Sequence, residues 1–286
     1  MSLEGARVLL TGGTGFIGSR VAASLDACRA DVHLLVRPSS RGDRLGPLWD
    51  TLKRVTGDLG NPASLKAAVK SVDPEYVLHL AKERDGSSFE REAKATAALA
   101  SALASAPCLK RWVRTAHAAP EKLGRGADAE LARALAARHK LFVTTLELYL
   151  VYGPGQKAGD FPRAFVEAAL DGAPLTAPAE AKDLVFVGDA AAAYLLAAEA
   201  PKAAGAWIPV GGGRLVPGLE AARAAAKAAG RRMEDVRAPG EAPRDGGHPA
   251  DLRTARELLG WKPRTGLDEG MAQLVQWIRD ERKGRG

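Results

Sequence analysis

The sequence of 286 residues has few cysteines and no long apolar run. Its two cysteines, Cys28 and Cys108, exclude a disulfide framework and lack the spacing of a metal site. No uninterrupted apolar stretch approaches about 18 residues, so we expect no membrane-spanning helix. A strand-like segment opens the chain where a secretory signal would stand, and we therefore expect a cytoplasmic protein.

Aromatic residues are also scarce, at 5% of the chain, although the formal net charge is +7. A basic chain suggests a nucleic-acid partner, but the charges are scattered and few side chains are available to stack on bases. We therefore expect neither a nucleic-acid partner nor a membrane partner. The five histidines are scattered as well, so no metal is expected.

The first half of the chain alternates short apolar runs with helical patterns. We expect strands over residues 7–11, 31–36, 52–56, 76–80, 111–115 and 141–148. Helices are expected between them over residues 16–27, 62–70, 89–105 and 127–138. Such alternation predicts an α/β fold with a doubly wound parallel sheet, the Rossmann fold, covered by helices on both faces.

The pattern changes after Tyr152, where the expected strands become fewer and shorter. Strands are expected over residues 184–187 and 207–210, and helices over 161–171, 190–199, 219–230, 250–259 and 267–282. The last helix is amphipathic, so we expect it to pack on the body of the protein. We predict a Rossmann domain over residues 1–155. A smaller α/β lobe takes most of 156–286, with some segments returning to the Rossmann core.

A glycine-rich segment, Thr11-Gly-Gly-Thr-Gly-Phe-Ile-Gly18, lies between the first expected strand and the first expected helix. Glycines there permit a tight turn and a close backbone approach to a pyrophosphate, and the helix N-terminus offers unpaired N–H groups. In this context the glycines indicate a dinucleotide site. The segment resembles the fingerprint of the extended short-chain dehydrogenase/reductase family, of the NAD-dependent epimerase/dehydratase type.

Five further segments resemble the same family and follow its order along the chain. They are Gly57-Asp58-Leu59, Val77-Leu-His-Leu-Ala81, Val151-Tyr-Gly-Pro-Gly155, Asp183-Leu-Val-Phe-Val187 and Leu259-Gly-Trp-Lys-Pro263. The resemblance implies a nicotinamide cofactor and a small-molecule ligand such as a nucleotide sugar. It places the cofactor on Gly12, Thr14, Gly15, Phe16, Ile17, Gly18, Arg37, Asp58, Leu59, Leu80, Ala81 and Thr115.

The end of the second expected strand bears on which nicotinamide cofactor binds. An acidic residue there would hold the adenosine ribose of NAD, but the sequence reads Val36-Arg37-Pro-Ser-Ser-Arg41. Arg37 and Arg41, with the two serines, are suited to a 2′-phosphate through charge-assisted hydrogen bonds. The segment therefore favours NADP over NAD. The alternative is that Arg37 stacks on the adenine, which the family permits with either cofactor.

The family's chemistry depends on a Tyr-x-x-x-Lys pair, and the sequence contains none. If Glu130 matches the glutamate that usually follows this lysine, Lys122 takes the tyrosine position and Gly126 takes the lysine position. The serines that follow the fifth strand in the family read Thr115-Ala116-His117 here, and Glu147 stands where an arginine is usual. Losing a positioned acid costs about 10²–10⁴ in rate. No intact catalytic set is therefore expected.

Three residues are candidates for substitute chemistry. His117 follows the fifth strand and titrates near neutral pH. Lys82 would contact a phosphate or carboxylate, and Tyr149 would face the nicotinamide; the alternative for each is an ordinary loop or packing residue. Tyr152 is expected to pack in the turn that follows the sixth strand, and His79 is expected to be a hydrogen-bonded histidine of the core.

Three functional hypotheses remain open from the sequence. The first is an NAD(P)-binding relative that has lost standard catalysis and acts as a sensor or regulatory subunit. The second is an atypical NADP-dependent oxidoreductase, or a sugar-nucleotide epimerase or dehydratase, that uses substitute residues. The third is a structural partner without a cofactor, which the intact glycine segment disfavours. The alanine-rich helices over 89–105 and 127–138 are suited to pairing in a homodimer.

Overall fold

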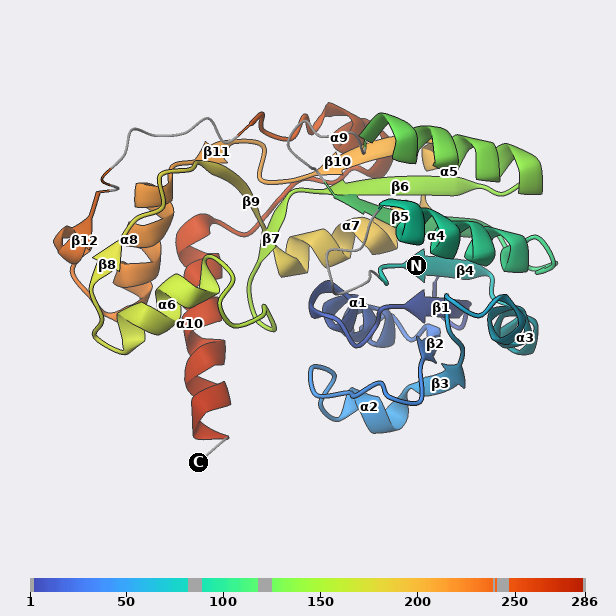
Figure 1. The fold of residues 1–286 in the computed structure, drawn as a ribbon, viewed down its shortest axis with the longest axis horizontal. Coiled ribbons are helices and arrows are strands. Elements are labelled where there is room, and N and C mark those ends of the chain that lie inside the picture. Colours follow the sequence, from blue (N-terminus) through green and yellow to red (C-terminus); the bar gives the residue numbers. More distant parts are fainter. Residues whose placement is uncertain (1–2, 82–88, 118–124, 239, 241–246, 285–286) are drawn as a thin grey trace. The chain divides into compact units, whose positions relative to one another are not determined.

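The computed structural model describes residues 3–81, 89–117, 125–238, 240 and 247–284 (Figure 1). The chain forms two compact units. Unit 1 consists of Met1–Glu147, Ala191–Ile208 and Thr254–Trp261, and unit 2 of Leu148–Ala190, Pro209–Arg253 and Lys262–Gly286. The predicted division at residue 155 stays a prediction.

The central element is a seven-stranded sheet of order β10-β6-β5-β4-β1-β2-β3. Its strands are β1 Arg7–Thr11, β2 Asp31–Val36, β3 Lys53–Thr56, β4 Tyr76–His79, β5 Arg111–His117, β6 Val143–Leu148 and β10 Trp207–Val210. The pairings from β3 through β2, β1 and β4 to β5 are parallel. The doubly wound parallel fold predicted from the sequence is therefore confirmed, and the late strand β10 returns to the edge of the sheet.

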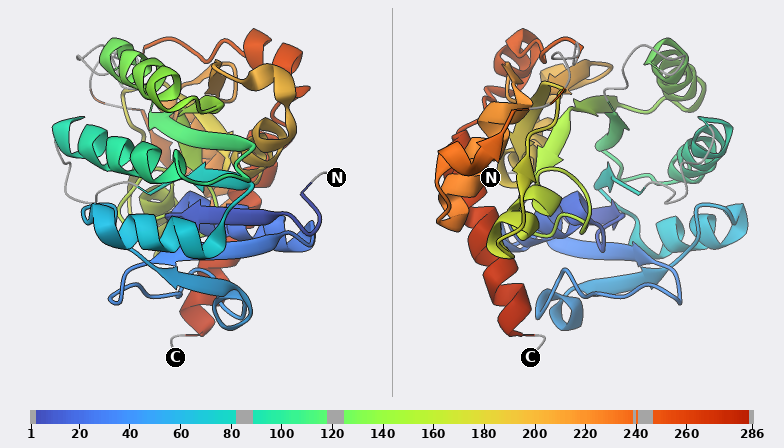
Figure 2. Two further views of the ribbon diagram at one scale, coloured as in Figure 1. Left: turned by 90° about the vertical axis from the view of Figure 1, so that its right-hand side faces the viewer. Right: turned by 60° about the vertical axis from the view of Figure 1, so that its left-hand side comes forward.

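Helices connect the parallel strands. They are α1 Phe16–Ala27, α2 Leu48–Thr51, α3 Pro62–Val72, α4 Phe89–Leu103 and α5 Arg125–His139, with α7 Val187–Glu199 and α9 Arg253–Leu259 further along the chain. Figure 2 shows α3, α4 and α5 side by side along one face of the sheet. Helix α3 begins at Pro62, after Asn61 accepts a hydrogen bond from the Ser64 amide and so caps the helix.

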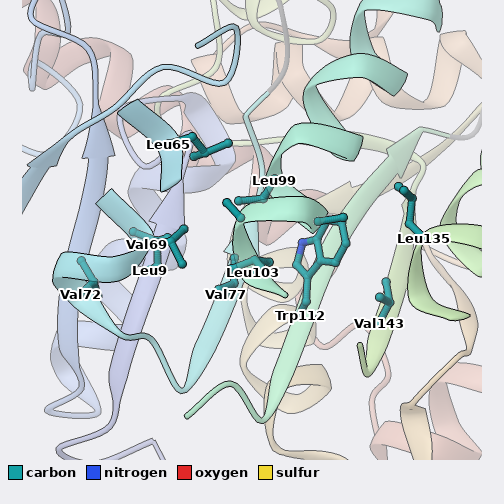
Figure 3. Close-up of a cluster of buried hydrophobic side chains, with 12 residues drawn as sticks. Leu9, Leu65, Val69, Val72, Val77, Leu99, Leu103, Trp112, Leu135 and Val143 are labelled. Carbon is teal, nitrogen blue, oxygen red and sulfur yellow. The ribbon is translucent and has the colours of Figure 1, made fainter. Parts of the chain in front are cut away.

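A hydrophobic cluster fills the space between the sheet and these three helices (Figure 3). Leu9, Val77 and Trp112 are register neighbours on β1, β4 and β5, so they form one apolar row across the sheet. Side chains two residues further along a strand point to the same face. The next row towards the carboxyl ends is therefore Thr11, His79 and Arg114. The switch from apolar to polar side chains marks the edge of the sheet that carries the candidate site.

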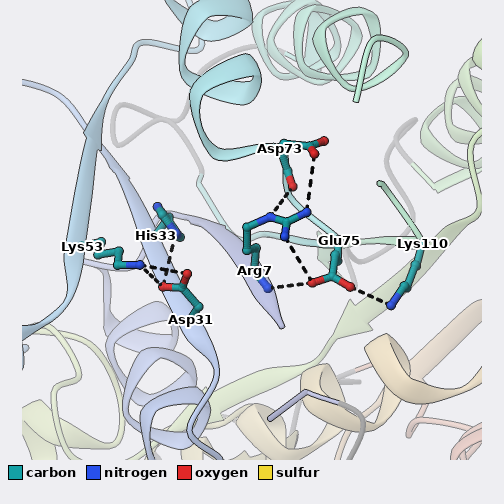
Figure 4. Close-up of polar contacts among 7 residues, drawn as sticks. All are labelled: Arg7, Asp31, His33, Lys53, Asp73, Glu75 and Lys110. Atoms are coloured by element: carbon teal, nitrogen blue, oxygen red, sulfur yellow. Dashed lines mark hydrogen bonds and ion pairs between the residues drawn. The ribbon is translucent and has the colours of Figure 1, made fainter. Parts of the chain in front are cut away.

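The amino-terminal ends of the strands carry a separate set of ion pairs (Figure 4). Arg7 Nε donates to the Asp73 carbonyl at 2.8 Å, and the Arg7 amide donates to Glu75 at 3.1 Å. Lys110 Nζ donates to Glu75 at 2.7 Å, which lowers the pKa of that carboxyl. Asp31 is held by Lys53 in the same way. These charges neutralise one another at the edge opposite the candidate site.

Many predicted boundaries differ from the observed ones by one to three residues, including the two that follow. Strand β5 continues two residues beyond Thr115 and ends at His117. The helix expected over 250–259 begins only at Arg253, because the Ala250 amide donates to the buried Asp183 carboxylate at 2.8 Å instead of starting a helix. The later start of α9 therefore comes from a long-range contact that local patterns do not reveal.

Unit 2 contains a three-stranded sheet of order β11-β9-β7 and a two-stranded sheet of β12 and β8. Its elements are β7 Leu150–Tyr152, α6 Arg163–Leu170, β8 Leu175–Thr176, β9 Lys182–Phe186, β11 Leu215–Val216, α8 Gly218–Ala229, β12 Val236–Arg237 and α10 Leu267–Lys283. Helix α10 buries Met271, Leu274, Val275 and Ile278, so it packs as the sequence predicts. Throughout the described residues, no helix has the length and apolarity needed to cross a bilayer.

Candidate cofactor site

The turn between β1 and α1 is built so tightly that its glycines have no room for side chains. Gly12 has a φ of +74°, and a Cβ there would lie 2.5 Å from the Ala81 amide nitrogen at the end of β4. A Cβ at Gly18 would overlap the Gly12 carbonyl oxygen. The turn therefore lies directly against the end of β4, and the first turn of α1 packs against the turn at Gly12.

The N-terminus of α1 is suited to an anion. Gly15 is the N-cap residue and supplies no capping side chain, and the first turn contains no acidic residue. The first amide N–H groups of a helix have no partner within the helix, and the helix dipole places partial positive charge there. A dinucleotide pyrophosphate fits these donors, and the glycines leave its oxygens room to approach.

The other predicted cofactor residues lie along the same edge of unit 1. Arg37 directly follows β2, Asp58 and Leu59 follow β3, and Leu80 and Ala81 follow β4. Asp58 is exposed and its carboxylate accepts a hydrogen bond from the Gly60 amide at 2.8 Å. Because β3, β2, β1, β4 and β5 are neighbours in the sheet, their carboxyl ends form one continuous row.

Arg37 directly follows β2 in this row and is exposed. Its amide donates to Ser40 Oγ at 3.0 Å, which closes the turn after β2. The acidic residue of β2, Asp31, lies at the opposite end of the strand, where Lys53 holds its carboxylate. The end of β2 therefore presents a cation and no acidic side chain.

His79 is a buried histidine, as the sequence predicts. Its Nδ1 lies 2.7 Å from Thr11 Oγ1, and the Ala81 amide donates to the same oxygen at 3.3 Å. Burial, reinforced by the positive charge of Arg114, lowers the pKa of His79 to about 3. The ring is therefore neutral near pH 7 and holds the ends of β1 and β4 together.

Thr115 lies near the end of β5, and its hydroxyl group is fully engaged. It donates to the His79 carbonyl at 2.9 Å, and its oxygen lies 2.5 Å from the Tyr194 hydroxyl of α7. Since Thr115 has already donated its proton to a carbonyl, Tyr194 is the donor in the second bond. Burial raises the pKa of Tyr194 above the ordinary tyrosine value. Sequence reasoning missed Tyr194, because nothing in its alanine-rich helix pointed to Thr115.

Arg114 is the second residue that sequence reasoning missed. Its side chain is 5% exposed, and Nη2 lies 2.5 Å from Asp128 Oδ1 in the first turn of α5. Its Nε and Nη1 atoms are buried and have no hydrogen-bond partner among the described residues. The signal that was available is a charged residue directly after the apolar pair Trp112 and Val113 of the same strand.

Of the three candidates for substitute chemistry, the structure describes the side chain of Tyr149 alone. Lys82, Lys122 and the side chain of His117 lie outside the described residues. Tyr149 belongs to unit 2 and is half-buried, and its amide donates to the Val210 carbonyl at 3.1 Å. Glu147, in the place of the usual arginine, is buried in β6.

Tyr152 and Tyr76 are both buried, and neither lies at the predicted cofactor edge. Tyr152 is buried in unit 2 with its ring edge-on to Phe186 at 5.8 Å, and burial raises the pKa of its hydroxyl. Tyr76 begins β4 at the opposite edge of the sheet, where Lys110 Nζ lies 5.8 Å from its ring centroid. Neither tyrosine is followed by lysine at the fourth position.

Unit 2 contains an open cavity of about 750 Å³ between α8 and the start of α10. Its lining includes Glu220, Arg223, Lys227, Leu267 and Asp268. The predicted cofactor residues contribute nothing to this lining. Within the part of the chain that the structure describes, no cluster of three or more potential metal-ligating side chains occurs.

Comparison with known proteins identifies the family. The model of the NAD dependent epimerase/dehydratase family matches residues 8–113 and 127–211. The chain belongs to this family. The match is interrupted over residues 114–126, which contain Thr115 and both positions assigned to the missing tyrosine and lysine.

Individual relatives agree with this assignment. The family member described here is 27% identical over 318 residues to a dTDP-glucose 4,6-dehydratase of Streptomyces niveus, covering 96% of this chain and 94% of the relative. The WbmF enzyme of Bordetella bronchiseptica in complex with NADH has the same fold, with a TM-score of 0.84, 20% identity and coverage of 99% and 94%. MoeE5 in complex with UDP-glucose and NAD gives a TM-score of 0.75 at 26% identity, covering 96% and 99%.

Proposed function

We propose that the protein binds NADP along the carboxyl edge of its parallel sheet and has lost the standard proton-transfer chemistry of its family. The observation that carries this proposal is the uncapped N-terminus of α1 beside the tightly packed Gly12 and Gly18. The same edge holds every predicted cofactor residue, and WbmF and MoeE5 were solved with NADH and NAD. When bound, the nicotinamide would supply hydride-transfer capacity, and the chain's residues would bind and orient the cofactor.

The preference for NADP over NAD rests on the end of β2. Arg37 is exposed there, its turn is closed by Ser40, and the five residues directly after the strand, 37–41, include no acidic one. A 2′-phosphate would gain charge-assisted hydrogen bonds from the guanidinium, whereas a 2′-hydroxyl would lack a carboxylate partner.

The proposed loss of catalysis rests on the hydroxyl groups. Thr115 donates to a carbonyl and accepts from Tyr194, so it has no proton left for a reacting oxygen. Burial raises the pKa of Tyr194 and of Tyr152, which weakens both as acids at neutral pH. Without a Tyr-x-x-x-Lys pair, we assign the protein a sensor or regulatory role.

The ligand class and the assembly are part of the same proposal. MoeE5 binds UDP-glucose, and we take a nucleotide sugar as the second ligand of this chain. The alanine-rich helices α4 and α5 are adjacent on one face of the sheet, and we propose them as the contact of a cytoplasmic homodimer. Sedimentation equilibrium tests the dimer directly.

A calorimetric titration with NADPH and then NADH tests the cofactor part of the proposal. Tighter binding of NADPH by at least about tenfold, about 1.4 kcal/mol, supports it. Absence of binding by both cofactors contradicts it and favours a structural role. Incubation of the loaded protein with UDP-glucose or dTDP-glucose tests the catalytic part. Conversion of either sugar would instead support an atypical oxidoreductase, epimerase or dehydratase.

A further inference from the structure

Arg114 has more hydrogen-bonding capacity than the described protein uses. Its side chain is 5% exposed, and among the described residues Nη2 alone is bonded, to Asp128. The Nε and Nη1 atoms are buried without a hydrogen-bond partner among the described residues. A buried donor without an acceptor loses its water and gains nothing in return, which makes such an arrangement costly.

The position of Arg114 relates it to one half of the proposed cofactor. Arg37 and Asp58 follow β2 and β3, and the pyrophosphate donors follow β1, so an extended dinucleotide continues over β4 and β5. Strand β5 lies two strand spacings beyond β1, about 10 Å. Arg114 is three residues before the end of β5 and pairs in register with His79 at the end of β4. It therefore belongs to the nicotinamide end of the row.

The first turn of α5 adds a second contribution at the same place. Asp128 fixes Nη2 in that turn, so the guanidinium lies beside the N-terminal end of a helix of 15 residues. Helix N-termini carry partial positive charge and favour oxygen atoms that accept hydrogen bonds. The Nε and Nη1 atoms of Arg114, which have no partner among the described residues, and this helix end prefer the same kind of ligand atom.

We propose that Arg114 donates hydrogen bonds from Nε and Nη1 to the hydroxyl oxygens of the ribose on the nicotinamide side of the cofactor. Asp128 is then a positioning residue that orients the guanidinium. Arginine keeps its proton at every physiological pH, so this contact binds the cofactor without serving as an acid or base. The inference rests on the proposed cofactor function.

A purely structural ion pair between Arg114 and Asp128 is the competing explanation. Replacing such a pair by apolar residues often leaves stability unchanged, so stability alone does not separate the two explanations. Affinity for separate parts of the cofactor does separate them. A structural pair would leave all fragments bound equally, whereas a ribose contact would affect only fragments that contain the second ribose.

The experiment compares 2′-phosphorylated ADP, which ends at the pyrophosphate, with 2′-phosphorylated ADP-ribose, which adds the second ribose. Both are titrated calorimetrically into the wild type and Arg114→Gln, a change that keeps an N–H donor for Asp128 but removes the charge. We expect the variant to lose about tenfold to hundredfold affinity for the ADP-ribose fragment, as hydrogen bonds to charged groups imply. Affinity for the ADP fragment should change less than twofold.

Arg111→Gln is the matched control. Arg111 is on the same strand, and its buried Nε and Nη1 atoms also have no partner among the residues that the structure describes. It begins β5 at the opposite edge, however, and its guanidinium lies 5.8 Å from the Phe142 ring centroid. Its replacement should leave both affinities unchanged. If Arg114→Gln does not fold, Asp128→Asn retains the arginine and should weaken the ADP-ribose fragment alone, by several-fold.

Each result has one meaning. Equal affinities for the ADP-ribose fragment in wild type and Arg114→Gln overturn the inference while the proposed function stands. A loss confined to intact NADPH would overturn the ribose assignment, because the acceptor would then be the nicotinamide. Failure of the wild type to bind the ADP fragment overturns the proposed function itself.

Discussion

The hydroxyl oxygens of Thr115 on β5 and Tyr194 on α7 lie 2.5 Å apart. The two residues are 79 positions apart in the sequence. The Thr115 hydroxyl forms a second hydrogen bond, which it donates to the carbonyl of His79. These two hydrogen bonds join the ends of β4 and β5 to α7, which lies on the opposite face of the sheet from Arg114. Thr115 lies close to the expected site of chemistry, but its hydroxyl group stabilises the fold instead.

We expect Thr115→Val and Tyr194→Phe each to lower the free energy of unfolding by about 1 kcal/mol, because each removes one side of a buried hydrogen bond. The double variant should lose less than the sum of the two, since the shared bond is removed only once. Chemical denaturation of the four proteins measures the coupling. Strict additivity would show that the two hydroxyl groups do not interact in solution.

Gly12→Ala should destabilise the protein by about 2 kcal/mol or more and abolish cofactor binding. A Cβ at Gly12 combines a strained φ of +74° with overlap on the Ala81 amide. Gly230→Ala is the control, because Gly230 has a φ of +87° and nothing within 4 Å of a new Cβ. The control should cost only the backbone strain, about 1 kcal/mol, and leave NADPH binding intact. Equal losses in both variants would contradict the close approach to β4.

Arg37→Ala should weaken NADPH binding by about tenfold or more and leave NADH binding within about twofold. The reason is that the guanidinium is proposed to contact only the 2′-phosphate. Arg29→Ala is a suitable control, because Arg29 is exposed and pairs with Glu4 away from this edge. Parallel loss of both cofactors would instead indicate that Arg37 stacks on the adenine.

His79 should make the protein less stable as the pH falls. Its pKa is lowered to about 3 by burial and by the charge of Arg114, whereas in the unfolded chain it is near the ordinary value of 6.5. The unfolded state therefore binds a proton between these values that the folded state does not. Stability contributed by neutral His79 is complete above pH 6.5 and falls by about 1.4 kcal/mol per pH unit below it.

Denaturant titrations at pH 7 and pH 5 measure this effect, with His79→Asn as the reference that removes the titrating ring. The loss between the two pH values should be smaller in the variant than in the wild type. An identical loss in both proteins would place the pH sensitivity in the carboxylates and contradict the low pKa of His79.

Local sequence patterns predicted most of the strands and helices of unit 1. The apolar runs of β1 and β2 and the glycines between Thr11 and Gly18 are signals carried by consecutive residues. They predicted the parallel α/β class and the family without long-range information, and the sheet topology and the family match confirmed both. The end of β5 and the start of α9 were wrong by a few residues, because tertiary contacts decide where pairing stops and a helix begins.

Sequence alone determined the fold class, the family and the segments that supply the carboxyl edge, because strand periodicity and glycine-rich turns are local properties of the chain. Only the tertiary structure decided what Thr115 and Arg114 contact. Thr115 bonds to Tyr194, and Arg114 is buried beside Asp128 with two nitrogens that have no partner in the described part of the chain. Hydrogen bonds between residues far apart in sequence depend on how helices pack across the sheet, and no local pattern encodes that geometry.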